Sequence, residues 1–85
     1  MNNQNKNYIP KVTIFVPIYN KAKYLKRSIG SIQRQTLKDI EIILINDCSI
    51  DDSFKIIKEF AQKDERIKII NILKIMGYYI LEQWE

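Results

Sequence analysis

The sequence predicts an α/β fold in which a small parallel sheet of three strands is joined by two helices. Three observations predict it: short runs of β-branched and aliphatic residues, amphipathic segments between these runs, and turn-forming residues at the junctions. Strands that alternate with helices favour parallel pairing through right-handed crossovers. The order β-α-β-α-β is half of a doubly wound nucleotide-binding fold, in which ligands bind beyond the carboxyl ends of the strands.

The predicted strands are residues 12–16, 40–45 and 67–72. The first, "VTIFV", lies between two prolines, and Pro17 lacks the N–H that would continue the ladder, so we expect the strand to stop there. The second, "IEIILI", is almost continuously apolar, which is typical of a strand covered on both faces. The third, "IKIINI", alternates only in part.

The first predicted helix spans residues 21–35, with Asn20 as its N-cap. Its apolar residues recur at helical spacing: Tyr24, Leu25, Ile29 and Ile32. Gly30 lowers the helix propensity, and a close contact between helix and sheet would explain it. The second helix has Ser49 as its predicted N-cap, with Asp52 three residues later in an approximate capping box. Its apolar stripe consists of Phe54, Ile57, Phe60 and Ala61.

Composition excludes several classes of site. The chain has 85 residues, which corresponds to one domain or part of one. With two glycines it has no glycine-rich phosphate loop. A single cysteine, Cys48, and no histidine exclude an internal disulfide, Cys/His zinc sites and histidine-dependent catalysis. The net charge of +4 comes from lysines spread along the chain, which does not indicate nucleic-acid binding.

The amino-terminal residues 1–11 form a polar, asparagine-rich segment that we expect to be a flexible lead-in. The segment lacks the apolar core of a secretory signal. No stretch of the chain approaches the roughly 20 apolar residues of a membrane-spanning helix. We therefore expect a cytoplasmic location without a transmembrane segment.

Two strand ends, "PIYN" and "NDCS", fall at the same edge of the predicted sheet. Tyr19 has a ring that can flank a nucleobase, although it can also pack on its own helix. Asp47 can accept a hydrogen bond from a base N–H or a ribose hydroxyl, or it can cap the next helix. Asn46 has the same two roles open to it. Cys48 is interpreted as a small turn residue, because no histidine is present to activate it.

These motifs resemble a known family. Residues 11–70 resemble the start of a family-2 glycosyltransferase with the GT-A fold, a Rossmann-like architecture. The family pattern P-x-Y-N is matched by Pro17, Tyr19 and Asn20. The following helix and loop match at Tyr24, Leu25, Ser31, Ile32, Gln35 and Thr36. The pattern D-D-G-S-T-D is matched at Asp47, Ser49 and Asp51.

The resemblance implies transfer of a sugar from a nucleotide-sugar donor, often UDP-linked, to an acceptor hydroxyl. Pro17 and Tyr19 would line the nucleoside pocket, and Asp47 would bind the base or the ribose. The nucleotide-binding set would be completed by Asn20, Asn46 and Ser49. The sequence departs from the pattern twice, because Asn46 replaces the first aspartate and Cys48 replaces the glycine. Cys48 therefore needs a backbone conformation that a non-glycine residue can adopt.

The family's Asp-x-Asp motif, which holds Mn or Mg, and its catalytic base would lie downstream of residue 85. We therefore expect the carboxyl-terminal half of the fold to be missing, with no catalytic residue, metal ligand or cofactor in the chain, and no activity of the chain alone. The alternative is a non-enzymatic α/β interaction module. In the usual strand order 3-2-1-4 the first strand would lose its outer neighbour, which predicts self-association through an open sheet edge.

The tail, residues 73–85, matches no family segment. Read in a neighbouring frame with codons that mostly end in A or T, it can encode N-N-G-L-L-Y-S-R-A-M-G, which resembles the family's N-x-G-x-x-x-A-R-N-x-G. We therefore expect truncation or a frameshift near residue 72. The predicted organisation is a lead-in at 1–11, a glycosyltransferase segment at 12–72 and an out-of-frame tail, which is exposed unless it packs on the sheet as a helix.

Overall fold

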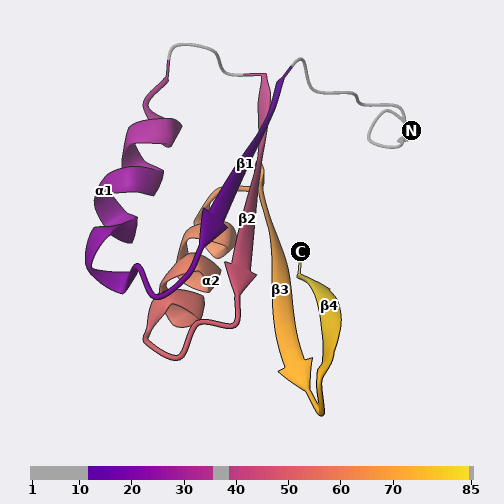
Figure 1. Ribbon diagram of the computed structural model, residues 1–85. Helices are drawn as coiled ribbons and strands as arrows, with labels where there is room; N and C mark the ends of the chain where they lie inside the picture. Colours follow the sequence, from indigo (N-terminus) through magenta and orange to yellow (C-terminus); the bar gives the residue numbers. More distant parts are fainter. Residues whose placement is uncertain (1–11, 36–38, 85) are drawn as a thin grey trace, which may run out of the picture.

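Four strands form one sheet, and both helices lie on the same side of it (Figure 1). The computed structural model describes residues 12–35 and 39–84, so the predicted lead-in 1–11 and Thr36 lie outside the described residues. In chain order the elements are β1 (Val12–Ile18), α1 (Ala22–Gln33), β2 (Ile40–Asp47), α2 (Ser53–Lys63), β3 (Ile67–Ile75) and β4 (Tyr78–Trp84). The first five confirm the predicted β-α-β-α-β order.

The strands lie side by side in the order β1-β2-β3-β4. β1 pairs with β2 in parallel, and β2 pairs with β3 in parallel, as predicted. β4 pairs with β3 in antiparallel orientation. Within the described residues no strand pairs with the outer edge of β1, so the expected open edge is present.

The tail does not form the helix that we considered. It continues β3 and then turns back as β4. The turn has two residues, Met76 and Gly77, whose φ angles are 52° and 84°. Positive φ at both central residues is the type I′ geometry, whose twist matches that of the two strands it joins. A hairpin with this turn pairs backbone groups that an isolated tail would leave to water. Whether the tail is out of frame stays a prediction.

Pro17 does not end the first strand, contrary to the prediction. The pairing continues past it, with Pro17 opposite Ile45 and Ile18 opposite Asn46. The physical reason is that β1 is an edge strand. A proline on an edge can place its missing N–H on the unpaired side, where the ladder needs no donor.

The core lies between the sheet and the two helices. Along β2, alternate residues from Ile40 to Asn46 are buried, which is the pattern of a strand with one face on the core. The core residues are Ile18, Leu25, Ile29, Ile40, Ile42, Leu44, Ile57, Ile67 and Ile69. Tyr24, which we had included in the apolar stripe of the first helix, is instead 59% exposed.

Gly30 is buried in α1, but no close approach of the sheet explains it. A Cβ at this position would meet only the side chain of Arg34, whose Nη1 atom would lie 3.1 Å away. The expected contact between helix and sheet was therefore wrong. Arg34 is long and flexible, so its side chain could move aside for a methyl group.

Two side-chain clusters hold the ends of the fold together. Asp64, the C-cap of α2, accepts a hydrogen bond from Gln33 of α1 and forms a 2.8 Å ion pair with Arg66 just before β3. At the other side, the rings of Phe54 and Trp84 meet edge to face with centroids 5.3 Å apart. The Lys58 ammonium lies 4.7 Å from the first ring centroid and 5.5 Å from the second. These contacts of Phe54, Trp84 and Lys58 hold β4 against α2, because the face of an aromatic ring attracts both the edge of another ring and a cation.

Neither helix in the described part of the chain is long and apolar enough to cross a bilayer. α1 has 12 residues and α2 has 11. A span requires about 20 apolar residues.

Candidate functional site

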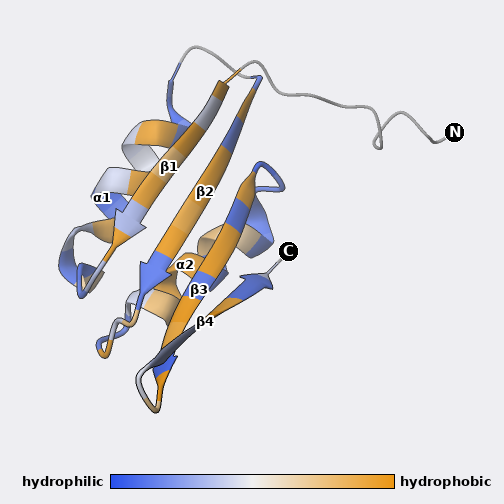
Figure 2. Cartoon of the chain, turned by 45° about the vertical axis from the view of Figure 1, so that its right-hand side comes forward, coloured by the Kyte–Doolittle hydropathy of each residue, from blue (hydrophilic) through white to orange (hydrophobic). Residues whose placement is uncertain are grey.

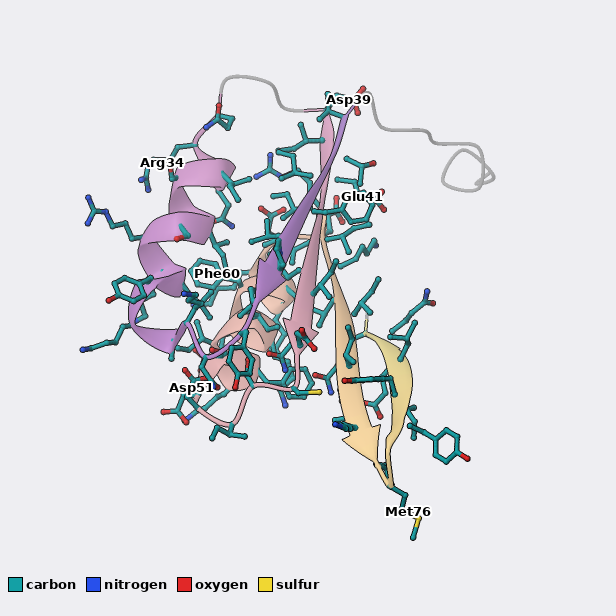
Figure 3. All side chains as sticks on the ribbon, in the orientation of Figure 1. Arg34, Asp39, Glu41, Asp51, Phe60 and Met76 are labelled. Carbon is teal, nitrogen blue, oxygen red and sulfur yellow. The ribbon has the colours of Figure 1, made fainter. Side chains whose placement is uncertain are left out.

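The loops that follow β1 and β2 lie next to each other at the carboxyl ends of the parallel strands (Figure 1). This is the edge at which ligands bind in open α/β sheets. Ile18 is opposite Asn46 in the register, so the two strands end at the same level. Figure 3 shows Asp51 at this end of the molecule and Glu41 toward the other end.

Asn20 joins the two loops. Its backbone N–H donates to Ser49 Oγ at 3.0 Å, and its side-chain Oδ1 accepts from the N–H of Ile50 at 2.8 Å. Its φ angle is 49°, in the left-handed region that asparagine tolerates better than most residues. Asn20 therefore does not cap α1, and Ser49 does not cap α2. Both bonds connect residues about thirty positions apart, which locks one loop against the other.

The amino terminus of α1 is capped by side chains from the other loop. The N–H of Lys21 donates to Ser53 Oγ at 3.0 Å, and the N–H of Ala22 donates to Asp51 Oδ2 at 3.1 Å. The other carboxylate oxygen of Asp51 accepts from the Ser53 N–H at 2.9 Å. Bonding by Ser53, and then by Ala22, lowers the pKa of Asp51 below its usual value. Lys21, at the N-cap position, contributes no side-chain bond.

Asn46 is buried on the side of the sheet that faces the helices. Its Nδ2 donates to Asn71 Oδ1 at 2.7 Å, and Asn71 Nδ2 donates in turn to Glu82 Oε1 at 3.0 Å. Because Glu82 accepts only, it fixes the orientation of the Asn71 amide and hence of Asn46. Asn46 Oδ1 is then left buried without a partner. Asn46 thus ties β2 to β3 and is 3% exposed.

Three of the predicted site residues are exposed at the edge: Pro17, Tyr19 and Asp47. Pro17 and Asp47 lie on the face of the sheet opposite the helices, because they alternate with the buried Ile18 and Asn46. The ring of Tyr19 is available, since the residue is 59% exposed. The structure thus separates the six predicted residues into these three and the three with bonded or buried side chains, Asn20, Asn46 and Ser49.

Cys48 adopts the left-handed conformation with φ 57°, and its N–H donates to the carbonyl of Ile72 at 3.1 Å. This hydrogen bond holds the β2 loop against β3. The departure from glycine at this position therefore falls at a residue whose backbone favours glycine.

Two residues important to this edge were missed from the sequence, Ser53 and Asn71. Ser53 is fully buried, although serine is usually exposed. Its position directly after two aspartates reads as a helix start, and nothing local indicates that it serves the other helix. Asn71 interrupts an isoleucine-rich strand, which was the available signal.

The described residues contain no group of three or more aspartate, glutamate or cysteine side chains that could hold a metal ion. The residues present therefore do not fit the divalent metal that the resemblance implies. The chemistry of this edge is that of a flat ring, a rigid proline and a carboxylate, groups that suit a nucleoside.

Comparison with known proteins shows which family the chain resembles. Residues 13–73 match the model of glycosyl transferase family 2. An uncharacterized glycosyltransferase of Bacillus subtilis, EpsJ, is 48% identical over 63 residues, covering 74% of this chain and 18% of the relative. The glycosyltransferase GlyA of Streptococcus pneumoniae is 48% identical over 60 residues, covering 71% of this chain and 9% of the relative.

A third relative has a more specific name. The GalNAc(5)-diNAcBac-PP-undecaprenol beta-1,3-glucosyltransferase of Campylobacter jejuni is 40% identical over 60 residues, covering 71% of this chain and 19% of the relative. The chain spans less than a fifth of the length of each of these three curated relatives.

Proposed function

The chain belongs to glycosyl transferase family 2, and from this premise we propose that it supplies the nucleoside-binding part of an enzyme that transfers a sugar from a UDP-sugar to an acceptor hydroxyl. One observation carries the proposal. Tyr19 and Asp47 are both exposed where β1 and β2 end, and the loops that follow these strands are locked together by four hydrogen bonds. A site held in place before its ligand arrives loses less entropy on binding.

Each exposed residue has a role that follows from its chemistry. The Asp47 carboxylate accepts from the imide N–H of uracil or from a ribose hydroxyl, because it is acceptor-only when ionised. Tyr19 flanks the base with its ring, and Pro17 gives the pocket a rigid wall. Asn20, Asn46 and Ser49 act on the nucleotide indirectly, by fixing the backbone that carries these side chains.

We propose no catalytic step for this chain. The described residues offer neither a metal site nor a histidine base, and so we propose binding without turnover. Binding is expected to be weak and independent of Mn²⁺, because the diphosphate would lack the metal that neutralises its charge.

The first test is calorimetric titration of the full chain with UDP and with a UDP-sugar, each with and without Mn²⁺. We expect binding that Asp47→Ala weakens by roughly tenfold or more, the cost of losing a hydrogen bond to a charged group. Asp52→Ala is the matched control, since Asp52 is an exposed aspartate in the same loop and caps no helix N–H. The proposal fails if UDP does not bind, or if the two variants weaken binding equally.

The tyrosines offer a second matched pair. Tyr19 and Tyr24 are each 59% exposed, but Tyr24 lies on α1. Loss of base stacking costs about 1–3 kcal/mol. Tyr19→Ala should therefore weaken UDP binding at least about fivefold, while Tyr24→Ala should leave it unchanged.

The alternative function, a non-enzymatic interaction module, is favoured by one observation. The outer edge of β1 is unpaired within the described residues and could accept a strand from another chain. The same titration separates the two functions, because a module of this kind has no reason to bind UDP or to depend on Asp47. The cytoplasmic location expected from the sequence stays a prediction.

A further inference from the structure

The face of the sheet opposite the helices has a definite pattern of side chains. Because alternate residues of a strand point to opposite faces, the residues that alternate with the core occupy this face. They are Thr13, Phe15, Pro17, Glu41, Ile43, Ile45, Asp47, Lys68, Ile70, Ile72, Lys74, Tyr79, Leu81 and Gln83. Figure 2 looks onto the strands with both helices behind them, and no helix in the described part of the chain covers this face.

The centre of the helix-free face is apolar. Four isoleucines of β2 and β3 occupy it: Ile43, Ile45, Ile70 and Ile72. On the two outer strands, Phe15 is 61% exposed and Leu81 is 66% exposed. An apolar area that extends across four strands is larger than the scattered apolar residues of an ordinary surface, and such areas mark interaction sites.

Charged residues bracket this centre and are sorted by strand. The acids, Glu41 and Asp47, lie on β2, and the bases, Lys68 and Lys74, lie on β3. Figure 3 shows Glu41 pointing to the side away from the helices. An apolar centre with a charged rim is the anatomy of a protein–protein interface.

The face is also hollowed near one end. A groove of about 210 Å³ is lined on this side by Glu41, Ile43, Lys68, Ile70 and Gln83, with Ile69 and Trp84 beneath. It lies over β3, between β2 and β4. A bulky side chain from a facing surface could fill it.

We propose that the helix-free face binds the same face of a second copy of this chain. A two-fold axis parallel to the strands and between β2 and β3 places β2 of each copy over β3 of the other. The acids of each β2 then face the partner's β3. The partner's lysines lie two residues farther along the strand, an offset of about 7 Å. Packed sheets are about 10 Å apart, so a lysine side chain can bridge the gap to the carboxylate. Packing β2 over the partner's β2 would set acid against acid.

The same axis places β1 of each copy over β4 of the other. Phe15 then lies above the β4 side of the partner's sheet, next to the groove. The arrangement therefore matches both the charges and the shape of the face.

The area of the face places the dimer in a size class of interfaces. Four strands about 4.8 Å apart, each contributing about seven residues of about 3.3 Å, give a footprint of roughly 400 Å² per copy. The total of roughly 800 Å² is below the about 1,200 Å² of standard stable interfaces. We therefore expect a weak, reversible dimer that forms only at high protein concentration. The dimer forms without nucleotide, and because Asp47 and Pro17 lie in both sites, bound nucleotide should weaken it.

Sedimentation velocity of the full chain from about 10 μM to about 500 μM tests the proposal. The mass should rise from 10.2 kDa toward twice that value over this range. Phe15→Glu and Leu81→Glu should each raise the dissociation constant at least about tenfold, because they bury an unpaired charge at the interface. Tyr24→Glu, which adds the same charge to an exposed aromatic residue on α1, should leave the dissociation constant unchanged.

A charge reversal tests the orientation. Glu41→Lys alone should weaken the dimer, and combination with Lys68→Glu should restore it to within about threefold of the original constant. In an equimolar mixture of isotope-labelled and unlabelled chain, filtered NOEs should connect Phe15 of one copy with β4 of the other. These two strands form opposite edges of the sheet, so the signal does not arise within one chain.

Two results would overturn the proposal. One is a chain that stays monomeric to the highest concentration. The other is a dimer that persists in folded Phe15→Glu and Leu81→Glu variants and lacks the NOEs, because such a dimer forms elsewhere, for example through the edge of β1. Far-UV circular dichroism of each variant shows whether it is folded.

Discussion

At the residue scale, Cys48 adopts a backbone conformation that is strained for any residue with a Cβ. Its φ of 57° lies in the left-handed region, where a Cβ costs about 1–2 kcal/mol. The hydrogen bond from its N–H to the Ile72 carbonyl keeps the backbone in that conformation. Glycine would relieve the strain but would lose about 0.5–1 kcal/mol through the greater entropy of the unfolded chain.

We therefore expect Cys48→Gly to raise the free energy of unfolding by about 0.5–1 kcal/mol. Cys48→Ala should give no such gain, because alanine keeps the Cβ. Urea unfolding of the three chains under reducing conditions measures the difference. Equal stability of the glycine and alanine variants would mean that the left-handed backbone at Cys48 stores no strain.

At the element scale, side chains from one segment complete the ends of another. α1 is capped by Asp51 and Ser53 from the loop before α2, and Asp64 at the end of α2 binds Gln33 of α1. The Arg66 guanidinium bonds both oxygens of the Asp64 carboxylate and holds its pKa at about 2, below the usual 3.8. The two helices are thus connected at both ends by charged or polar groups.

The lowered pKa of Asp64 makes a prediction about acid. The folded chain binds the proton less readily than the unfolded chain, so the stabilisation is fully present above about pH 4 and is lost as the pH falls to about 2. Asp64→Asn should lower the free energy of unfolding by about 1–2 kcal/mol at neutral pH, a value reduced for partial exposure. The difference from the original chain should be largely lost near pH 2.

Urea unfolding at several pH values between about 2 and 7 measures this convergence. Asp52→Asn is the control, because Asp52 begins the same helix and makes no capping bond. A difference for Asp64→Asn that is constant with pH would show that the carboxylate charge is not what stabilises the loop.

At the scale of the whole molecule, one layer of helices covers one face of the sheet. The core consists of nine buried apolar residues among the described residues, and the opposite face holds isoleucines that are only half-buried. A chain of this size buries a smaller fraction of its surface than a larger domain does, so its stability is expected to be marginal.

We expect thermal unfolding at low concentration with a midpoint below about 60 °C, monitored by circular dichroism. If the helix-free faces pair, the midpoint should rise with protein concentration, because association stabilises the folded chain by mass action. A cooperative transition above about 60 °C in a dilute sample would contradict the expectation.

The sequence by itself determined the order and type of the first five elements, because helical and strand periodicities are local properties of the chain. It also placed Pro17, Tyr19 and Asp47 at the edge where ligands bind, since parallel strands bring their carboxyl ends together.

Only the tertiary structure decided which groups are free at that edge. Asn20 and Ser49 read locally as helix caps, yet they bond to residues about thirty positions away. Asn46 reads as a surface residue of a turn, yet it pairs in the core with Asn71. The local sequence pattern did not predict β4, because the position of this strand depends on the turn at Gly77 and on packing against α2. A polar side chain bonds to whichever group the fold brings within about 3 Å, and separation in sequence does not reveal that group.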